Sequence, residues 1–197
     1  MSKAIIEAAF GVKHQNYTTV INGLAILYFE LGNFDKAEKY YQQALDNRLV
    51  MYGENHAETI TCLNNLGALY MMRLTYETDT VKGRQWFDKA EALMKRVLVA
   101  DSIIVGTEHP DYATYLNNLA ELYRVAGMPV KAEPLYNKSK SIEEKSHGKE
   151  HPAYAVLLHN MSLMYSALGQ YEKAEEYAMN SYAIKKKVYG ENSPMCN

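Results

Sequence analysis

The chain has 197 residues, of which 21 are basic and 23 acidic, and its formal net charge is −2. This balance excludes the basic excess expected of a nucleic-acid-binding protein, and no apolar run approaches the ~18–20 residues that a membrane span needs. A hydrophobic share of 48% argues against disorder, and two cysteines are too few for a disulfide framework, so we expect a folded cytoplasmic protein.

Three short sequence marks recur along the chain, and together they define tandem repeats. A Leu-Tyr or Met-Tyr pair recurs at spacings of 42, 53 and 42 residues, and a Lys-Ala-Glu triplet recurs at spacings of 53, 42 and 42. A Gly-x-x-His link separates successive repeats in the same register. The pairs end at Tyr28, Tyr70, Tyr123 and Tyr165, the triplets begin at Lys36, Lys89, Lys131 and Lys173, and the links end at His14, His56, His109 and His151.

In chain order, the marks divide the sequence into a leading stretch, four repeats and a tail. Residues 1–14 are expected to be the end of a preceding helix and its link. The four repeats span 15–56, 57–109, 110–151 and 152–193, and the tail spans 194–197. Each repeat is predicted to form two helices joined by a turn, because the apolar residues of the first helix, such as Leu63, Leu66 and Tyr70, fall on one helical stripe.

The second repeat departs from this plan by an 11-residue insertion within 71–86. Eleven residues make about three helical turns, so longer helices would keep their phase. The polar run 75–80 is the predicted bend. No polar capping helix is evident after Tyr189, although solenoid ends usually need one. We therefore expect that the chain is a fragment of a longer array, or that an open end mediates self-association.

The repeats resemble the tetratricopeptide repeat (TPR), in particular its kinesin light chain type. The similarity rests on the 42-residue period, the Gly-x-x-His-Pro link and two phrases, Leu-Asn-Asn-Leu-Ala-Glu-Leu-Tyr at 116–123 and Lys-Ala-Glu-Pro-Leu-Tyr at 131–136. The resemblance implies an all-α fold, a right-handed α-solenoid of helix-turn-helix repeats that forms a single array. It also implies a concave groove lined by the first helix of each repeat.

A second stripe on these first helices is the candidate peptide-binding groove. Its residues are spaced so that each set lies on one helix face. The candidate residues are Thr19, Asn22, Phe29, Thr61, Asn64, Met71, Met72, Thr114, Asn117, Glu121, Arg124 and His159. Asparagine amides at equivalent positions can satisfy the backbone of an extended peptide, and methionines can form adaptable pockets. Alternatively, these asparagines bond to neighbouring helices and brace the stack.

The charges on this stripe argue against a clamp for carboxylates. The resemblance implies grooves with lysines and arginines that hold acidic peptides, but here only Arg124 is basic, and Glu121 one turn earlier is expected to pair with it. A neutral or mixed peptide is the expected ligand. Asn65, Asn118 and Asn160, one position further along, are assigned to packing between helices.

Other reactive side chains have structural interpretations. His147 and His151 have i, i+4 spacing, but Gly148 interrupts the helix that a zinc site would need, so no metal and no cofactor is predicted. The link histidines are expected to form hydrogen bonds at helix ends. Cys62 is interpreted as a small core residue, and acidic pairs such as Glu143-Glu144 are interpreted as solvated helix faces.

The sequence thus predicts a non-catalytic interaction module that binds a partner peptide in a concave groove. No nucleophile elbow, phosphate-binding loop or Cys-x-x-Cys motif is present. Two alternatives stay open. The chain could be an oligomerisation segment that uses its end faces and the insertion of the second repeat, or a regulatory domain of a larger signalling protein or enzyme.

Overall fold

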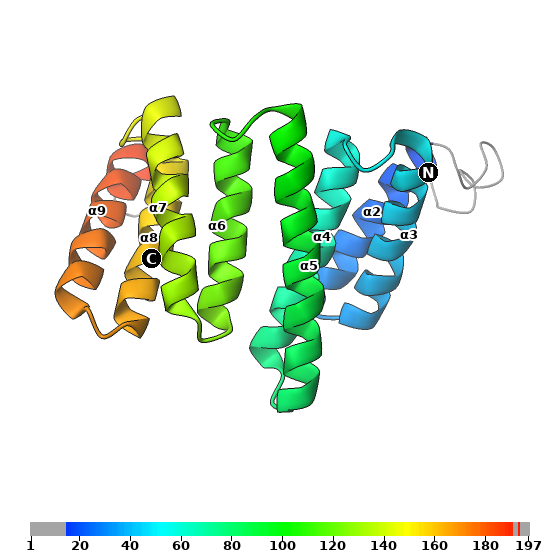
Figure 1. Cartoon of the computed structure of the whole chain (residues 1–197), viewed down its shortest axis with the longest axis horizontal. Coiled ribbons are helices and arrows are strands. Elements are labelled where there is room, and N and C mark those ends of the chain that lie inside the picture. Colours follow the sequence, from blue (N-terminus) through cyan, green and yellow to red (C-terminus); the bar gives the residue numbers. More distant parts are fainter. Residues whose placement is uncertain (1–14, 191–192, 194–197) are drawn as a thin grey trace. The chain divides into compact units, whose positions relative to one another are not determined.

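The structure is a computed structural model that describes residues 15–190 and residue 193. The helix and link expected at residues 1–14, and the tail at 194–197, lie outside the described residues. The helices are α2 (Gln15–Glu30), α3 (Phe34–Tyr52), α4 (Ala57–Tyr76), α5 (Thr80–Ile104), α6 (Pro110–Val125), α7 (Pro129–Ser146), α8 (Pro152–Ala167) and α9 (Tyr171–Tyr189) (Figure 1). Since the described residues include no strand, the all-α prediction is confirmed.

The chain divides into two compact units, and the boundary lies between Ile104 and Val105. The first unit holds helices α2 to α5, and the second holds α6 to α9. None of the helices within residues 15–190 is long and apolar enough to cross a membrane.

Histidines start three of the helices in the same way. The Nδ1 atoms of His56, His109 and His151 each accept a hydrogen bond, at 3.2 Å, from the backbone N–H two residues further on. This bond satisfies one of the free donors in the first helical turn. The predicted hydrogen bonding of these histidines at helix ends is therefore confirmed, while His14 lies outside the described residues. The preceding link glycines, such as Gly53 with φ of 76°, occupy the left-handed region that favours glycine.

In the first unit, α2 pairs with α3, α4 pairs with α5, and α3 also packs against α4. The facing sides bury aliphatic side chains such as those of Ile21, Leu63 and Leu66. Helices α4 and α5 approach closely at Gly67, where an added Cβ would lie 3.2 Å from Cγ of Met94. Burial of this apolar area is the main stabilising term, because one repeat cannot shield its own stripe.

In the second unit, α6 pairs with α7 and α8 pairs with α9, while α8 also packs against α7 and contacts α6. Leu122, Tyr136, Met161 and Met164 are fully buried among these helices. Helix α9 contributes only Ser181 to the buried residues of this unit. The side of α9 that faces away from α8 is therefore exposed.

The recurring marks of the sequence are contacts within and between repeats. In every repeat the lysine of the Lys-Ala-Glu triplet lies over the tyrosine ring of the same repeat, 4.9 to 5.6 Å from the ring centroid. The glutamate accepts a hydrogen bond from the tyrosine of the following repeat, at 2.8 Å from Tyr70 to Glu38 and at 3.1 Å from Tyr165 to Glu133. These two bonds lie in the first and second unit, and they explain why the marks keep one register.

The insertion of the second repeat lengthens both of its helices. Helix α4 has 20 residues and α5 has 25, whereas the equivalent helices α6 and α7 have 16 and 18. The connection between them occupies residues 77–79, inside the polar run. Asp79 accepts hydrogen bonds from the backbone N–H groups of Val81 and Lys82, and these bonds lower the pKa of its carboxyl group. Trp86 stacks on Tyr70 with the ring centroids 5.7 Å apart, so the added length packs on α4.

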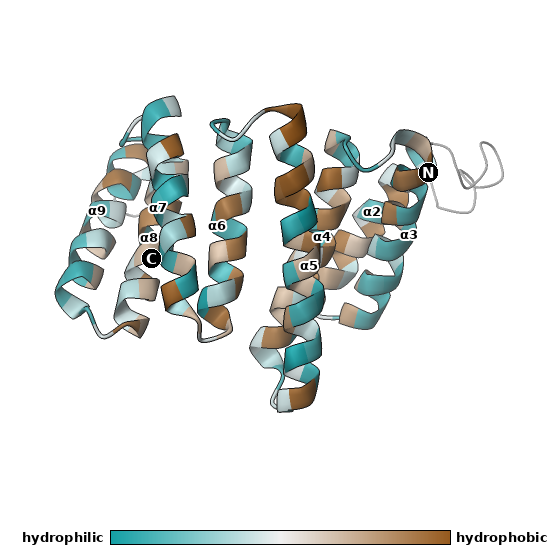
Figure 2. Cartoon of the chain, in the orientation of Figure 1, coloured by the Kyte–Doolittle hydropathy of each residue, from teal (hydrophilic) through white to brown (hydrophobic). Residues whose placement is uncertain are grey.

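The C-terminal end of α5 is rich in hydrophobic residues (Figure 2). Val99 and Ile103 are each 62% exposed. This end of α5 therefore differs from its middle, where Leu93, Met94 and Val97 are buried.

Candidate functional site

In the first unit, the candidate residues of α2 are only partly open to solvent. Thr19 is exposed, and its hydroxyl accepts a hydrogen bond of 3.4 Å from Nη2 of Arg48. Asn22 is half-buried, and its Oδ1 is shielded from solvent with no hydrogen-bond partner among the described residues. The half-buried ring of Phe29 lies against Phe34, with the centroids 6.0 Å apart. Of this set, Thr19 is the most accessible.

The candidate residues of α4 combine helix bonding with open apolar surface. The hydroxyl of Thr61 donates to the backbone oxygen of Ala57 at 2.9 Å, which is a bond within the helix. Asn64 is half-buried and already has an interaction partner. Met71 and Met72 are half-buried, so part of each flexible side chain is available for contact.

In the second unit, the asparagines of two first helices meet directly. Asn160 on α8 donates through Nδ2 to Oδ1 of Asn117 on α6, at 3.0 Å. The assignment of Asn160 to packing between helices is therefore confirmed. The carbonyl oxygen of Asn117 takes part in this bracing, as the alternative interpretation expected. Asn117 nevertheless lines a cavity as well.

Glu121 and Arg124 form the predicted pair on α6. Nε of Arg124 donates to Oε2 of Glu121 at 2.8 Å, and Nη2 donates to Oε1 at 2.5 Å. The hydroxyl of Tyr136 donates to Oε2 as well, at 2.8 Å. Burial opposes ionisation of Glu121, but the hydrogen bonds and charge of Arg124 outweigh it, so the pKa of Glu121 lies below its ordinary value. This cation is therefore committed to an internal partner, which disfavours a carboxylate clamp.

His159 on α8 is exposed and interacts electrostatically with both members of this pair. Desolvation is the largest effect on its imidazole, and the positive charge of Lys185 adds to it, so the pKa of His159 is lowered. The lowered pKa favours the neutral imidazole, which can both donate and accept a hydrogen bond.

A cavity of about 240 Å³ opens among α6, α7 and α8, within the second unit. It is lined by Ala113, Thr114, Asn117, Ser139, Glu143, Ala153, Val156 and Leu157. The structure thus brings two candidate residues, Thr114 and Asn117, into one cleft. We call this cavity the α6–α8 cleft.

The sequence interpretation of Glu143 is wrong. Glu143 is only 4% exposed, whereas it was expected on a solvated helix face. It lies four residues after Ser139, seven after Tyr136 and eleven after Ala132, all buried, so it belongs to the inward stripe of α7. Its Oε2 lies 2.9 Å from Nδ1 of His147. A search restricted to the first helices could not find this residue.

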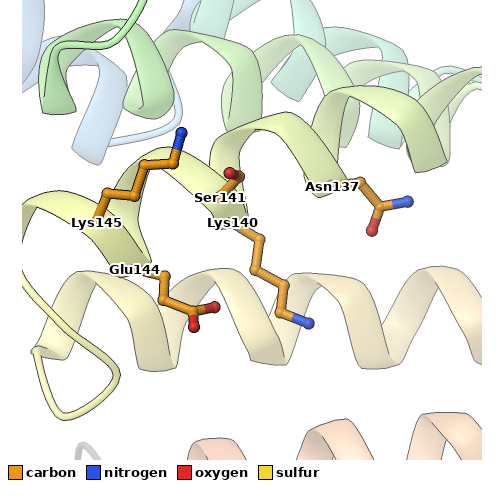
Figure 3. A pocket seen from close by; sticks show the side chains of 5 residues that line it. All are labelled: Asn137, Lys140, Ser141, Glu144 and Lys145. Carbon is orange, nitrogen blue, oxygen red and sulfur yellow. The ribbon is translucent and has the colours of Figure 1, made fainter.

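A larger hollow, of about 580 Å³, runs along the outside of α7 (Figure 3). All of its lining residues come from this one helix. Its charged groups already have partners within the chain. Glu144 contacts Lys149 at 3.0 Å, Lys145 contacts Glu108 at 3.4 Å, and Lys140 donates to the hydroxyl of Tyr177 at 3.3 Å. The hollow has a single wall, and we do not assign a ligand to it.

One cluster could in principle hold a metal ion. Ligand atoms of Glu143, His147 and His151 lie within 4.8 Å of one another. The rings of the two histidines stack, however, with centroids 4.3 Å apart, and Tyr52 stacks on His56 at 4.2 Å in the equivalent place of the first unit. The ring of Tyr52, which has no imidazole nitrogen, makes the same stack, so packing accounts for this geometry. The absence of a metal stays a prediction.

Cys62 is buried on α4, as its interpretation as a core residue expected. Burial is the main cause that raises the pKa of the Cys62 thiol to about 11. The thiolate is therefore scarce at neutral pH, which disfavours a nucleophilic role.

Solved structures of other proteins share this fold. A variant of the nearly identical TPR-like repeats from a Podosopora anserina protein named after kinesin light chains superimposes with a TM-score of 0.74 at 22% identity, covering 94% of this chain and 82% of that one. BtubC (BKLC) from P. vanneervenii has a TM-score of 0.72 at 24% identity, covering 90% of this chain and 66% of that one. These similarities establish a shared fold.

Sequence relatives are much longer proteins. Clustered mitochondria protein homologs match with 29% identity over 107 residues in Aspergillus fumigatus and with 31% over 123 residues in Aspergillus terreus. The matches cover 53% and 60% of this chain but only 8% and 9% of those proteins. The chain thus spans less than a tenth of their length.

The model of the tetratricopeptide repeat matches residues 2–49, 17–73 and 113–187. These matches cover well over half of the chain and include both units. Together with the paired helices and the shared fold, they confirm the resemblance inferred from the repeated marks. The chain therefore belongs to the tetratricopeptide repeat family.

Proposed function

We propose that this chain binds an extended polypeptide segment of a partner protein, and that the α6–α8 cleft receives a side chain of that segment. Tetratricopeptide repeats are in general modules for protein interaction. The proposal adds a place and a mode of binding to that general role. The observation that carries it is the convergence of Thr114 and Asn117 on one cavity walled by three helices.

The size and lining of the cleft support a polypeptide ligand. A volume of about 240 Å³ is below the ~300–1,000 Å³ of ordinary small-molecule pockets, and it suits one large side chain. Polar atoms of Thr114 and Asn117 stand beside the apolar surface of Val156 and Leu157. Since the walls are helices fixed by packing, binding orders mainly the ligand, which limits the entropic cost.

A non-catalytic role is part of this proposal. The fold is that of a non-enzymatic scaffold family. The buried thiol of Cys62 is protonated at neutral pH, and the Glu121–Arg124 pair is bonded internally. These side chains support binding and structure.

A peptide selection tests the proposal. Peptides of twelve residues would be selected from a random display library, and their affinity would be measured for the unchanged chain and for an Ala153→Phe variant. Ala153 lines the cleft, so the larger ring should fill it and weaken binding by at least about tenfold. Ala178→Phe on the exposed side of α9 is the matched control. Equal affinity of both variants would reject the cleft as the binding place.

A second candidate function is self-association through α9. This helix exposes Tyr171, Met179 and Val188 to extents of 71%, 62% and 45%. Exposed apolar side chains of this kind favour contact with another surface. Light scattering at increasing protein concentration would test it. A dimer that is lost when Tyr182 and Tyr189 are changed to serine supports this function, and a monomer at all concentrations contradicts it.

A regulatory domain within a larger protein is a third possibility. The long relatives, of which the chain covers 8–9%, are the observation that favours it. In that case the cleft would bind a segment of the parent chain or of its partner. The peptide selection above applies equally to such a segment.

A further inference from the structure

The first unit contains an internal counterpart of the α6–α8 cleft. A shift of 95 residues aligns residues 110–165 with residues 15–70, which precede the insertion, because the two repeat lengths of 42 and 53 add to 95. Under this shift Glu143 corresponds to Arg48, Ala153 to Glu58, Thr114 to Thr19 and His147 to Tyr52. The two places can therefore be compared residue by residue.

In the first unit this place is filled by a guanidinium group. Arg48 is 3% exposed, and its Nη2 lies 2.9 Å from Oε2 of Glu58 and 3.4 Å from Oγ1 of Thr19. Its guanidinium carbon lies 5.6 Å from the ring centroid of Tyr52. The fold thus accommodates a buried guanidinium group, which extends from α3 and contacts side chains of α2 and α4.

In the second unit the charge is reversed and the facing side chain is shortened. Glu143 stands in place of Arg48, and Ala153 stands in place of the glutamate that pairs with it. The α6–α8 cleft is the space that these two changes leave, and both residues line it. A buried carboxylate is stable when it is paired, and the partner found within the chain is His147, at 2.9 Å.

We propose that the α6–α8 cleft accepts an arginine side chain from the bound polypeptide, with its guanidinium group against the carboxylate of Glu143. The inference rests on the proposed function and names the side chain that the cleft selects. A guanidinium group can form two parallel bonds to a carboxylate, which gives arginine an advantage over lysine. The oxygens of Thr114 and Asn117 are further acceptors, and Val156 and Leu157 contact the methylene groups.

The first test compares peptides that differ only in charge. Peptides selected on the unchanged chain should be enriched in arginine at one position. Replacing that arginine with citrulline, which is neutral and has the same shape, should weaken binding by about 10- to 100-fold, as expected for loss of a charged hydrogen bond. Lysine in its place should bind with intermediate affinity. This measurement needs no protein variant, so it does not depend on whether a variant folds.

The second test changes the carboxylate. With Glu143→Gln, arginine and citrulline peptides should bind equally well. The double variant Glu143→Arg with Ala153→Glu rebuilds the pair found in the first unit, so it should fill the cleft and abolish the preference for arginine. Thermal unfolding of each variant checks that the second unit is still folded.

The possible outcomes separate this inference from the proposed function. If no peptide is selected, or if Ala153→Phe has no effect on binding, the proposed function fails and this inference fails with it. If binding of the selected peptides is weakened by Ala153→Phe but the peptides show no preference for arginine, this inference alone is overturned. The same holds if the preference for arginine persists in Glu143→Gln. All selections are repeated in the presence of EDTA. If acidic peptides are preferred and EDTA removes that preference, Glu143, His147 and His151 hold a metal ion, and the arginine inference is overturned.

Discussion

The hydrogen bond from Tyr70 to Glu38 links consecutive repeats, and its loss should have a measurable cost. The bond is 2.8 Å long, and Tyr70 is 6% exposed. A hydrogen bond to a charged group contributes ~1.5–3 kcal/mol. Glu38 keeps a second partner, since Nη2 of Arg73 lies 3.0 Å from its Oε2. The carboxylate is not left unpaired in Tyr70→Phe, so we expect a cost near the lower limit, about 1.5 kcal/mol.

A double-mutant cycle isolates this bond. The variants are Tyr70→Phe, Glu38→Gln and their combination, and the expected coupling energy is about 1–2 kcal/mol. Urea unfolding can be followed by the fluorescence of Trp86, which is the single tryptophan and lies 5.7 Å from the ring of Tyr70. Tyr76→Phe is the control because Tyr76 is 71% exposed, and it should change the free energy of unfolding by less than about 0.5 kcal/mol.

A coupling energy below about 0.5 kcal/mol would refute this explanation of the repeated marks. In that case the glutamate of the Lys-Ala-Glu triplet would not stabilise the contact between repeats, and only its lysine and alanine would explain why the triplet recurs. The same cycle with Tyr165 and Glu133, 3.1 Å apart, tests the second unit independently.

Three further predictions concern single side chains. The pKa of Glu121 is lowered in the folded chain. Its ionised carboxylate therefore stabilises the fold above the unfolded pKa of about 4.3, and this stabilisation is lost as the pH falls through the lower folded pKa. In Glu121→Gln, the melting temperature should therefore depend less steeply on pH between about pH 5 and 3. An unchanged pH dependence contradicts this. In a Cys196→Ser variant, Cys62 should resist a thiol reagent in the folded state and react on unfolding. Rapid labelling of the folded chain would contradict this. Gly67→Val should destabilise the chain by ~1–3 kcal/mol in urea unfolding, whereas Gly23→Ala, with nothing within 4 Å, should not destabilise it.

The fold was largely predictable because it repeats. The Gly-x-x-His links, the Leu-Tyr pairs and the Lys-Ala-Glu triplets each mark one place in a repeat, and each has a local cause. His56 caps α4 through its own side chain, and Lys89 lies over the ring of Tyr70 in the same repeat. Contacts so close along the chain leave a clear signal in the sequence.

The candidate site was predictable only in part, because one of its lining residues, Glu143, lies on the second helix of its repeat. Thr114 and Asn117 were found from the stripe on a first helix. Glu143 was missed because its neighbour Glu144 suggested a solvated acidic face, although the spacing from Ser139 placed it on the buried stripe. The alignment of Glu143 with Arg48 could have revealed it, since charged residues at equivalent inward-facing positions of two repeats indicate a buried polar site.

The partial burial of the asparagines was a matter of packing and could not be predicted. Sequence spacing places Asn22, Asn64 and Asn117 on equivalent faces, but it does not determine how close the neighbouring helices lie. In the structure Asn117 accepts a bond from Asn160, and Oδ1 of Asn22 is shielded from solvent. The role of these residues as peptide contacts stays a prediction, and the cleft beside Asn117 is where it can be tested best.

The most direct test of the account maps a bound peptide on the folded chain. A peptide selected for affinity would be titrated into the isotope-labelled protein, and the backbone amide signals would be followed by nuclear magnetic resonance. We predict that the largest shifts fall on α6, α7 and α8, at residues around the cleft such as Thr114, Glu143 and Val156. Shifts confined to the exposed side of α9, or to the outer face of α7, would contradict the account.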